Sequence, residues 1–448
     1  MFDTVLIANR GEIALRVART CRELGLRTVA VYSSADADSA VVRFADQSVH
    51  IGPANSKHSY LNPAALIEAA VQTGAQAIHP GYGFLSEDAD FAQICAENDI
   101  VFIGPSPKVM AMLSDKSEAR TAMAAAGLPV LPGSPAALTS LAEADALAGR
   151  IGFPLILKAV AGGGGRGMAV VTARTELARA YDECRAGAQA IFGDGRLYAE
   201  RYLPVARHVE VQVLCDGHGG AVSLGERDCS VQRRHQKLIE EAPAPRLPDG
   251  LARRMGDAAV RGALAVGYEG VGTFEFLVDP GGEFYFMEIN CRIQVEHPVT
   301  ELVTGLDLIR EQLLVAAGGL VSLRQEDLVP RGVAIECRVN AEDPDRGFRP
   351  APGVLTGFDL PGGPFTRVDT HCVTGYTIPP NYDSLLAKLI VWAPDRDQAL
   401  ARMDRALSEL RVNGPGVRTT TDFLRRVLAQ PRFRAGTHAT SLVGEMLG

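Results

Sequence analysis

Residues 272–290 run GTFEFLVDPGGEFYFMEIN, and this stretch decides how the middle of the chain folds. Its two apolar, aromatic-rich halves flank the turn sequence Pro-Gly-Gly-Glu, which predicts a hairpin of two antiparallel strands. A four-residue loop would set Asp279 opposite Phe284, and the same register carried along the strands sets Glu275 opposite Glu288. The pattern therefore predicts two carboxylates on one face of the hairpin, with their Cβ atoms about 5 Å apart.

Two opposed carboxylates repel each other unless they are protonated or bridged by a cation. Asn290 lies two positions beyond Glu288, so its side chain is expected on the same face. Two carboxylates and an amide oxygen suit Mg²⁺ or Mn²⁺, which prefer oxygen ligands and bridge phosphates. We therefore predict that Glu275, Glu288 and Asn290 hold a divalent metal. The alternative is that the glutamates pair with arginines, or that the register is shifted by one residue.

The segment CRIQVEHPVTE (291–301) follows the hairpin directly. If the chain stays extended there, Arg292, Gln294 and Glu296 share a face with Asn290. A guanidinium and a carboxylate on one face could hold and deprotonate a small anionic substrate.

Two upstream segments carry further polar side chains. The strict alternation of HVEVQV (208–213) places His208, Glu210 and Gln212 on one side of an expected strand. The basic run QRRHQK (232–237) has, by itself, the composition of a solvated surface.

A glycine-rich loop, AGGGGRG (161–167), lies between the expected strands 155–160 and 168–172. Consecutive glycines let backbone N–H groups approach an anion, and Arg166 adds positive charge. A Walker A loop or a dinucleotide fingerprint would open a helix, whereas β-branched residues follow here. We predict a mobile flap over phosphates, with Lys158 and Lys116 as candidate phosphate contacts; a β-turn without a ligand is the alternative.

The first hundred residues alternate short β-branched runs with helical patterns, which predicts a parallel sheet covered by helices. The expected strands are 4–8, 28–32, 77–79 and 101–103, and the expected helices are 12–24, 64–73 and 89–98. The proline-rich stretch 128–137 predicts a linker, and a last unit is expected to begin near Gly332. The predicted fold class is α/β, organised in three units.

The composition excludes several classes of protein. Hydrophobic residues make up 47% and charged residues 22% of the 448 residues, which is typical of globular domains rather than of disorder or a coiled coil. The net charge of −8 argues against non-specific nucleic-acid binding. The N-terminus lacks a signal-peptide pattern, no apolar run is long enough to span a membrane, and the eight cysteines are scattered, so a cytoplasmic protein is expected.

Eight motifs, in this order and spacing, resemble those of biotin carboxylase, an ATP-grasp enzyme, and the resemblance covers essentially the whole chain. The motifs are IANRGEIALRVART (7–20), HPGYGFLSE (79–87), IGPSP (103–107), KAVAGGGGRGM (158–168), RHVEVQV (207–213), ERDCSVQRRHQKLIEEAP (226–243), MEINCRIQVEHPVTE (287–301) and AIECRVNAEDP (334–344). The resemblance implies an N-terminal parallel α/β domain, a central ATP-grasp fold with a mobile lid, and a C-terminal mixed α/β domain. The implied boundaries are 1–113, 114–330 with the lid at about 131–203, and 331–448.

The resemblance also implies which residues bind ATP and metal. The implied ATP-binding residues are Lys116, Lys158, Gly163, Gly164, Gly165, Arg166, Gly167, Glu200, Arg201, Leu203, His208, Gln232, His235, Lys237, Glu275 and Glu288. The glycine loop would close over the phosphates, the segment 200–203 would hold the adenine, and His208 would hold the ribose. Glu275, Glu288 and Asn290 match the metal positions of the family, in agreement with the hairpin pattern, and two Mg²⁺ or Mn²⁺ ions are expected.

The catalytic groups are implied in the same way. The implied bicarbonate site is Lys237, Arg292, Gln294, Val295 and Glu296, and the implied biotin site is Tyr82 and Arg338. Glu296 would deprotonate bicarbonate, which would attack the γ-phosphate of ATP to give carboxyphosphate. That intermediate would release CO₂ and phosphate, and the phosphate would take a proton from the biotin ureido nitrogen. Arg338 would stabilise the resulting enolate-like biotin.

The implied partners follow from this reaction. No A-M-K-M biotin-attachment segment occurs, so biotin is expected on a separate biotin carboxyl carrier protein. Carboxyltransferase subunits would pass the carboxyl group on, most often to acetyl-CoA for malonyl-CoA and fatty acid synthesis, with another acyl-CoA or pyruvate as alternatives. A homodimer is expected. Two other functions stay open from the sequence: a different ATP-grasp ligase, and a catalytically silent nucleotide-binding subunit.

Overall fold

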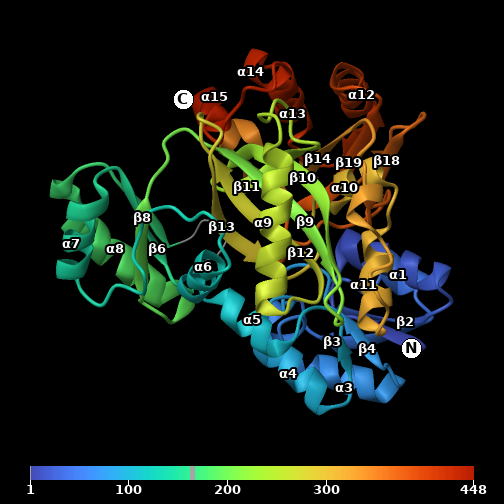
Figure 1. The fold of residues 1–448 in the computed structure, drawn as a ribbon. Coiled ribbons are helices and arrows are strands. Elements are labelled where there is room, and N and C mark those ends of the chain that lie inside the picture. The colour runs from blue at the N-terminus through green and yellow to red at the C-terminus, as the bar shows by residue number, and fades with distance from the viewer. Residues whose placement is uncertain (1, 162–166) are drawn as a thin grey trace.

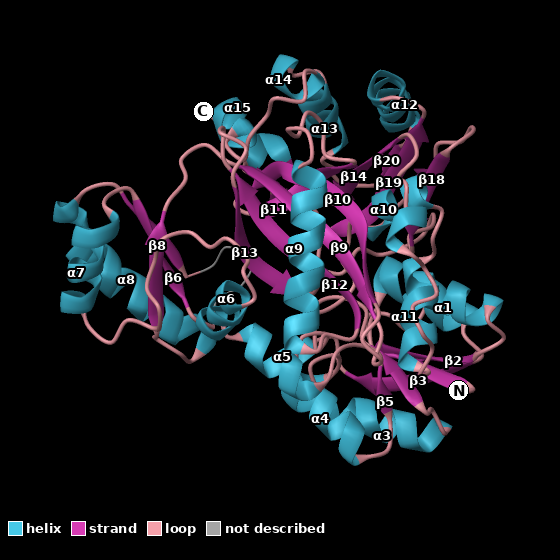
Figure 2. Ribbon diagram, in the orientation of Figure 1, coloured by secondary structure: helices cyan, strands magenta, loops and turns pink. Residues whose placement is uncertain are grey.

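The computed structural model describes residues 2–161 and 167–448, in which helices and strands mix throughout (Figure 1, Figure 2). The N-terminal part is a parallel sheet with strand order β3-β2-β1-β4-β5. Its strands are β1 (Thr4–Ile7), β2 (Arg27–Ser33), β3 (Gln47–Gly52), β4 (Ala77–His79) and β5 (Val101–Phe102). The accompanying helices are α1 (Gly11–Glu23), α2 (Ala40–Phe44), α3 (Pro63–Thr73) and α4 (Ala89–Glu97). The predicted parallel sheet is confirmed.

The sequence pattern missed β3 and α2. Strand β3 lies at an edge of the sheet, and Ile51 is its buried residue, whereas its other side chains are exposed or half-buried. An edge strand of this kind carries too few apolar residues to show the run that marks a buried parallel strand.

A larger antiparallel sheet forms the body of the molecule, with strand order β13-β12-β9-β10-β11-β14-β19-β18. Its strands are β9 (Arg207–Cys215), β10 (Ala221–Arg233), β11 (Gln236–Ala242), β12 (Gly270–Val278), β13 (Phe284–Asn290), β14 (Val333–Asn340), β18 (Thr366–Thr370) and β19 (Leu385–Ala393). Helix α9 (Leu251–Val266) crosses one face of this sheet (Figure 1). Strands β14, β18 and β19, which follow residue 331, therefore extend the central sheet, while the short strands β15 (Glu342–Asp343) with β16 (Arg349–Pro350) and β17 (Gly357–Asp359) with β20 (Arg411–Asn413) form two small sheets.

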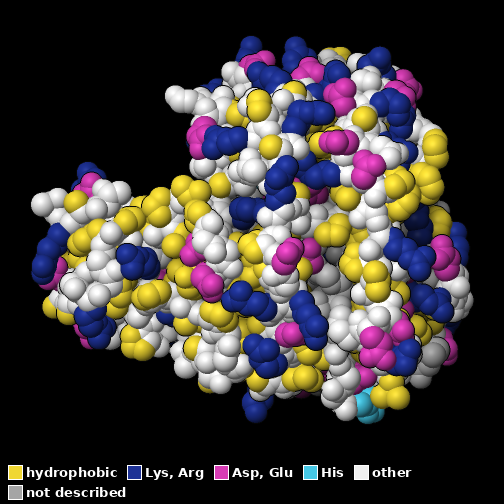
Figure 3. Space-filling model, turned by 45° about the horizontal axis from the view of Figure 1, so that its top comes forward, with side chains coloured by type: hydrophobic (Ala, Val, Ile, Leu, Met, Phe, Trp, Pro, Cys, Tyr) yellow, Lys and Arg dark blue, Asp and Glu magenta, His cyan; other side chains and the backbone are white. Residues whose placement is uncertain are grey.

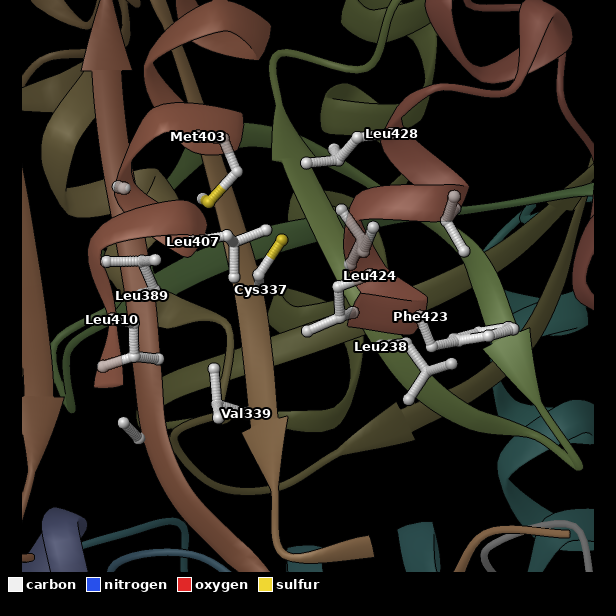
Figure 4. Close-up of a cluster of buried hydrophobic side chains, with 14 of the residues drawn as sticks. Leu238, Cys337, Val339, Leu389, Met403, Leu407, Leu410, Phe423, Leu424 and Leu428 are labelled. Atoms are coloured by element: carbon white, nitrogen blue, oxygen red, sulfur yellow. The ribbon is translucent and has the colours of Figure 1, made fainter. Parts of the chain in front are cut away.

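The C-terminal part also shares a hydrophobic core with the central part. Leu238 of β11 lies beside Phe423 and Leu424 of α13 (Thr421–Leu428) in Figure 4. Cys337 of β14 and Leu407 of α12 (Arg396–Glu409) belong to the same buried cluster. The shared strands and core fix the C-terminal part against the central sheet.

A small antiparallel sheet, β7-β6-β8, projects from the body with two helices packed on it (Figure 1). Its elements are β6 (Leu155–Ala159), β7 (Met168–Val171), β8 (Leu197–Arg201), α7 (Leu141–Ile151) and α8 (Arg174–Phe192). These elements have a hydrophobic core of their own, around Leu147, Leu157 and Tyr181. The prediction that the glycine-rich loop joins two strands is confirmed, while Gly163, Gly164, Gly165 and Arg166 lie outside the described residues.

The remaining helices are α5 (Pro107–Ser114), α6 (Lys116–Ala125), α10 (His297–Thr304), α11 (Leu308–Ala316), α14 (Pro431–Arg434) and α15 (Leu442–Leu447). Of these helices, α10 packs on the central sheet through Val299 and Val303, which form a buried cluster with Ala334 and Ile390. In the part of the chain that the structure describes, no helix combines the length and apolar character needed to cross a bilayer. Lys and Arg side chains are interspersed with Asp and Glu on the face shown in Figure 3.

Candidate active site

The hairpin of β12 and β13 sets Glu275 directly opposite Glu288, as predicted. The register near the turn differs from the prediction, because Phe284 faces Val278 and not Asp279. The carboxylate of Asp279 instead accepts hydrogen bonds from turn N–H groups, which tightens the turn. A β-bulge at Met287 then shifts the register by one residue and restores the predicted opposition of the glutamates.

Lysine side chains neutralise both glutamates in the structure. Lys237 Nζ lies 2.8 Å from Glu275 Oε1, and Lys116 of α6 pairs with Glu288. His208 Nε2 lies 3.2 Å from the other oxygen of Glu275. Burial alone would raise the pKa of Glu275, but Lys237 and His208 outweigh it and hold that pKa well below its ordinary value.

Lys237 contacts three carboxylates of the site. Its ammonium donates to Glu210 at 2.6 Å, to Glu275 at 2.8 Å and to Glu296 at 2.6 Å. Burial opposes the charge, but these three carboxylates hold the pKa of Lys237 well above its ordinary value. Lys237 therefore stays a cation at the point where the hairpin carboxylates meet Glu296.

Glu296 is fully buried and accepts from a second cation as well. Its Oε2 lies 2.8 Å from Nη2 of Arg338, which comes from β14. The condition that the chain stays extended up to Glu296 is not met, because β13 ends at Asn290 and Glu296 immediately precedes helix α10. Pro298 sits in the first turn of that helix, a position that favours helix initiation.

Arg292 and Gln294 reach the site in spite of this turn. Gln294 Nε2 lies 3.3 Å from Glu275 Oε1, and Arg292 Nη1 lies 3.0 Å from Gln294 Oε1. Asn290 Nδ2 donates to the same Glu275 oxygen at 2.9 Å. Arg292 and Gln294 therefore lie near Asn290 and Glu275 because the loop between β13 and α10 brings them there, and not because they share the face of a strand.

A cleft of about 1130 Å³ brings the predicted residues together. The predicted residues that line it are Tyr82, Lys116, Lys158, Glu200, Arg201, Leu203, His208, Gln232, His235, Lys237, Glu275, Glu288, Asn290, Arg292, Gln294, Val295 and Arg338. Glu296 lies directly behind this wall, in contact with Lys237 and Arg338. The predicted residue Gly167 lies outside this lining set.

The end of the cleft near β8 carries a further ion pair. Lys158 of β6 pairs with the buried carboxylate of Glu200, and Arg120 Nη1 lies 3.4 Å from the same carboxylate. His208 Nδ1 and Gln232 Nε2 lie 2.7 Å apart between this end and Lys237. The cleft therefore runs from the projecting sheet to Arg338, with cationic side chains along its length.

Family models match the chain along most of its length. Residues 1–110 match "Biotin carboxylase, N-terminal domain", residues 115–324 match "Carbamoyl-phosphate synthase L chain, ATP binding domain", and residues 336–445 match "Biotin carboxylase C-terminal domain". The biotin carboxylase of Nostoc sp. is 52% identical over 445 residues, covering 99% of both chains. The chain belongs to the biotin carboxylase family.

Solved structures of the biotin carboxylase family have the same fold. The Campylobacter jejuni biotin carboxylase, in its beta-gamma-ATP complex, is 48% identical, with a TM-score of 0.97 over 99% of both chains. The biotin carboxylase domain dimer of the Hydrogenobacter thermophilus 2-oxoglutarate carboxylase, in complex with MgADP, ADP and bicarbonate, is 44% identical. Its TM-score is 0.96, over 99% of this chain and 98% of that one.

Three residues of this biotin carboxylase site had no role in the sequence prediction. Glu210 is fully buried between Lys237 and Arg227, whose Nε lies 2.6 Å away. Glu87 accepts from Arg292 Nε at 2.9 Å. The alternation around His208 placed Glu210 on the correct face, but the partners of all three residues lie on other strands or loops.

The oxygen-rich donor set fits the hard cations expected for this family. Glu275 and Glu288 face each other, and Asn290 contacts Glu275. Ligand atoms of His208, Glu210 and Glu275 also lie within 4.8 Å of one another. A set dominated by carboxylate and amide oxygens suits Mg²⁺ or Mn²⁺ better than softer metals.

Proposed function

We propose that this chain uses ATP and bicarbonate to carboxylate biotin carried by a separate protein. The observation that carries the proposal is the position of Glu296 between Lys237 and Arg338, at 2.6 and 2.8 Å. Lys237 joins Glu296 to the proposed metal and phosphate end of the cleft, and Arg338 joins it to the proposed biotin end. One base in contact with both ends suits a reaction that first activates bicarbonate and then carboxylates biotin.

The nucleotide is proposed to lie along the cleft from β8 to the hairpin. Lys116, Lys158 and the glycine-rich loop would contact its phosphates, and residues 200–203 its adenine. Glu275, Glu288 and Asn290 would hold Mg²⁺ or Mn²⁺, which would supply positive charge to the phosphates. The ATP- and ADP-bound relatives support this placement, since their folds match this chain closely.

In the proposed reaction, Lys237, Arg292 and the Gln294–Val295 backbone hold bicarbonate while Glu296 takes its proton. The bicarbonate oxygen bonds to the γ-phosphorus as the bond to ADP breaks, which gives carboxyphosphate. Carboxyphosphate splits into CO₂ and phosphate, the phosphate takes the ureido proton, and the biotin nitrogen attacks CO₂. Fixed cations stabilise each anion, and closure of the lid, formed by about residues 131–203, over the cleft would exclude water.

Partners and domain limits belong to the same proposal. We propose division at 113/114 and 330/331, which the three matched family ranges support. A biotin carboxyl carrier protein and carboxyltransferase subunits are the proposed partners, acetyl-CoA is the proposed acceptor, and the dimeric relative supports a homodimer. Another acyl-CoA or pyruvate is the alternative acceptor. The cytoplasmic location stays a prediction, since three relatives are named as chloroplastic.

The deciding experiment measures ADP release by purified protein with Mg-ATP and bicarbonate, with and without free biotin. We expect release that requires both bicarbonate and biotin. Bicarbonate-independent turnover with an amine acceptor would instead support a different ATP-grasp ligase. ATP binding without turnover, even with a biotinylated carrier protein, would support a silent nucleotide-binding subunit.

A further inference from the structure

Lys388 of β19 is a fully buried lysine that joins the N-terminal, central and C-terminal parts of the fold. Its Nζ lies 3.0 Å from Glu12 Oε1 on helix α1 and donates to the Val295 carbonyl at 3.0 Å. Asp369 of β18 lies 3.7 Å away. A buried ammonium is costly unless it is paired, so these contacts define its position closely.

Both branches from Lys388 lead to the cleft. Glu12 accepts a hydrogen bond from the hydroxyl of Tyr82, which lines the proposed biotin end. Val295 lines the proposed bicarbonate end, and its carbonyl belongs to the peptide that joins it to Glu296. Lys388 thus lies behind the wall of the cleft. It contacts the Val295–Glu296 peptide directly and the Tyr82 hydroxyl through Glu12.

The charge of Lys388 is maintained by its surroundings. Burial opposes it, but the carboxyl groups of Glu12, Glu336 and Asp369 outweigh burial and hold the pKa of Lys388 above its ordinary value. A hydrogen bond donated by a charged group is stronger than a neutral one. The Val295–Glu296 peptide is therefore held firmly beside the proposed base.

We infer that Lys388 is a positioning residue for both half-reactions, holding the Val295–Glu296 peptide for bicarbonate and, through Glu12, the Tyr82 hydroxyl for biotin. This inference rests on the proposed function of the cleft. Loss of an ion pair with a purely structural role would lower the stability of the protein without changing the KM values for bicarbonate and biotin relative to that for ATP. If Lys388 positions both groups, its loss should raise the KM for bicarbonate through Val295 and the KM for biotin through Glu12.

The test compares steady-state KM values for bicarbonate, free biotin and ATP in Lys388→Met, Glu12→Gln and the double variant. Lys388→Met is expected to raise the KM for bicarbonate and for biotin about tenfold each, as the loss of one charged hydrogen bond predicts. The KM for ATP should change less than about twofold. Glu12→Gln should raise the KM for biotin alone, and its effect on that KM should not add to that of Lys388→Met.

Two further variants keep the result interpretable. Lys388→Arg keeps the charge near Glu12 but places its donors differently, so it is expected to fold and still to raise the bicarbonate KM. Arg396→Met is the matched control, because Arg396 pairs with buried Glu241 at 2.7 Å in the same part of the chain, away from the cleft. Arg396→Met should lower Tm and leave all three KM values unchanged.

The outcomes distinguish a failure of the inference about Lys388 from a failure of the proposed function on which it rests. Wild-type protein without biotin- and bicarbonate-dependent ADP release would reject the proposed function and the inference with it. An active wild type whose Lys388→Arg and Lys388→Met variants keep normal KM values, with a lowered Tm like that of Arg396→Met, would overturn the inference alone. Equal bicarbonate effects in Glu12→Gln and Lys388→Met would also overturn it, because the two branches would not be separate.

Discussion

Glu296 Oε2 and Arg338 Nη2 lie 2.8 Å apart, although the two residues are 42 positions apart in the chain. Arg338 also donates to the buried carboxylate of Glu240 at 2.6 Å, and the other oxygen of Glu296 faces Lys237. The proposed base is therefore held by two cations before any substrate binds. Changing any member of this group leaves a buried charge without its partner.

Glu296→Ala is expected to lower biotin-dependent ADP release at least about a hundredfold, because the general base is lost. The affinity for ATP should stay near wild type, since Glu296 lies behind the cleft wall and contacts Lys237 and Arg338. ADP release and nucleotide titration measure the two effects. Unchanged turnover would remove Glu296 as the base.

Arg338→Gln is expected to reduce kcat with biotin at least tenfold while the KM for ATP stays near wild type. It should also lower the free energy of unfolding by about 3 kcal/mol, because Glu240 and Glu296 lose a buried partner. Kinetics and urea unfolding test the two parts. A normal kcat with lowered stability would restrict Arg338 to a structural role.

Glu288→Lys is expected to abolish activity, because it places a cation among the proposed metal ligands and beside Lys116. Glu283→Lys is the matched control, since Glu283 is exposed in the turn of the same hairpin. ADP release is measured over a range of Mg²⁺ and Mn²⁺ concentrations. Rescue of Glu288→Lys by excess Mn²⁺ would count against direct ligation by Glu288.

Glu240→Gln is expected to change the pH dependence of stability. Burial raises the pKa of Glu240 from 4.5 to about 7, against the opposing effect of Arg338. Between about pH 4.5 and 7 the folded protein then binds more protons at this site than the unfolded chain, so this site's contribution to stability falls as pH rises. The Gln variant lacks that decline.

Urea unfolding of both proteins at several values between pH 5 and 8 tests this expectation. The stability of Glu240→Gln relative to wild type should increase as pH rises through this window. A difference that stays constant with pH would show that Glu240 has its ordinary pKa in the folded protein.

Arg227→Met is expected to lower the free energy of unfolding by about 3–5 kcal/mol, because it leaves Glu210 with one cation fewer in a fully buried site. Arg253→Met on the exposed side of α9 is the control, and its effect should stay within about 0.5 kcal/mol. Thermal and urea unfolding measure both variants. Equal effects would show that the Arg227 pair adds little to stability.

Local sequence patterns predicted what depends on neighbouring residues. The alternation of side chains along a strand has a period of two residues, so it placed His208 on the side of Glu210. The opposition of Glu275 and Glu288 was also predicted correctly, but it depends on the bulge at Met287 as well as on the hairpin pattern. The alternation of strands and helices likewise predicted the N-terminal parallel sheet, because each unit repeats locally. The motifs, in their order, then indicated the family, which the comparisons confirm.

Only the tertiary structure decided which distant groups meet. The bulge at Met287 has no periodic signal, and the pairing of β11 with β14 inside the central sheet brings Arg338 to Glu296 and Glu240. The contacts of Lys388 with Glu12 and Val295 likewise join three parts of the chain. Such contacts depend on strand order and on the packing of charges in a buried volume, which the spacing of residues along the sequence does not encode.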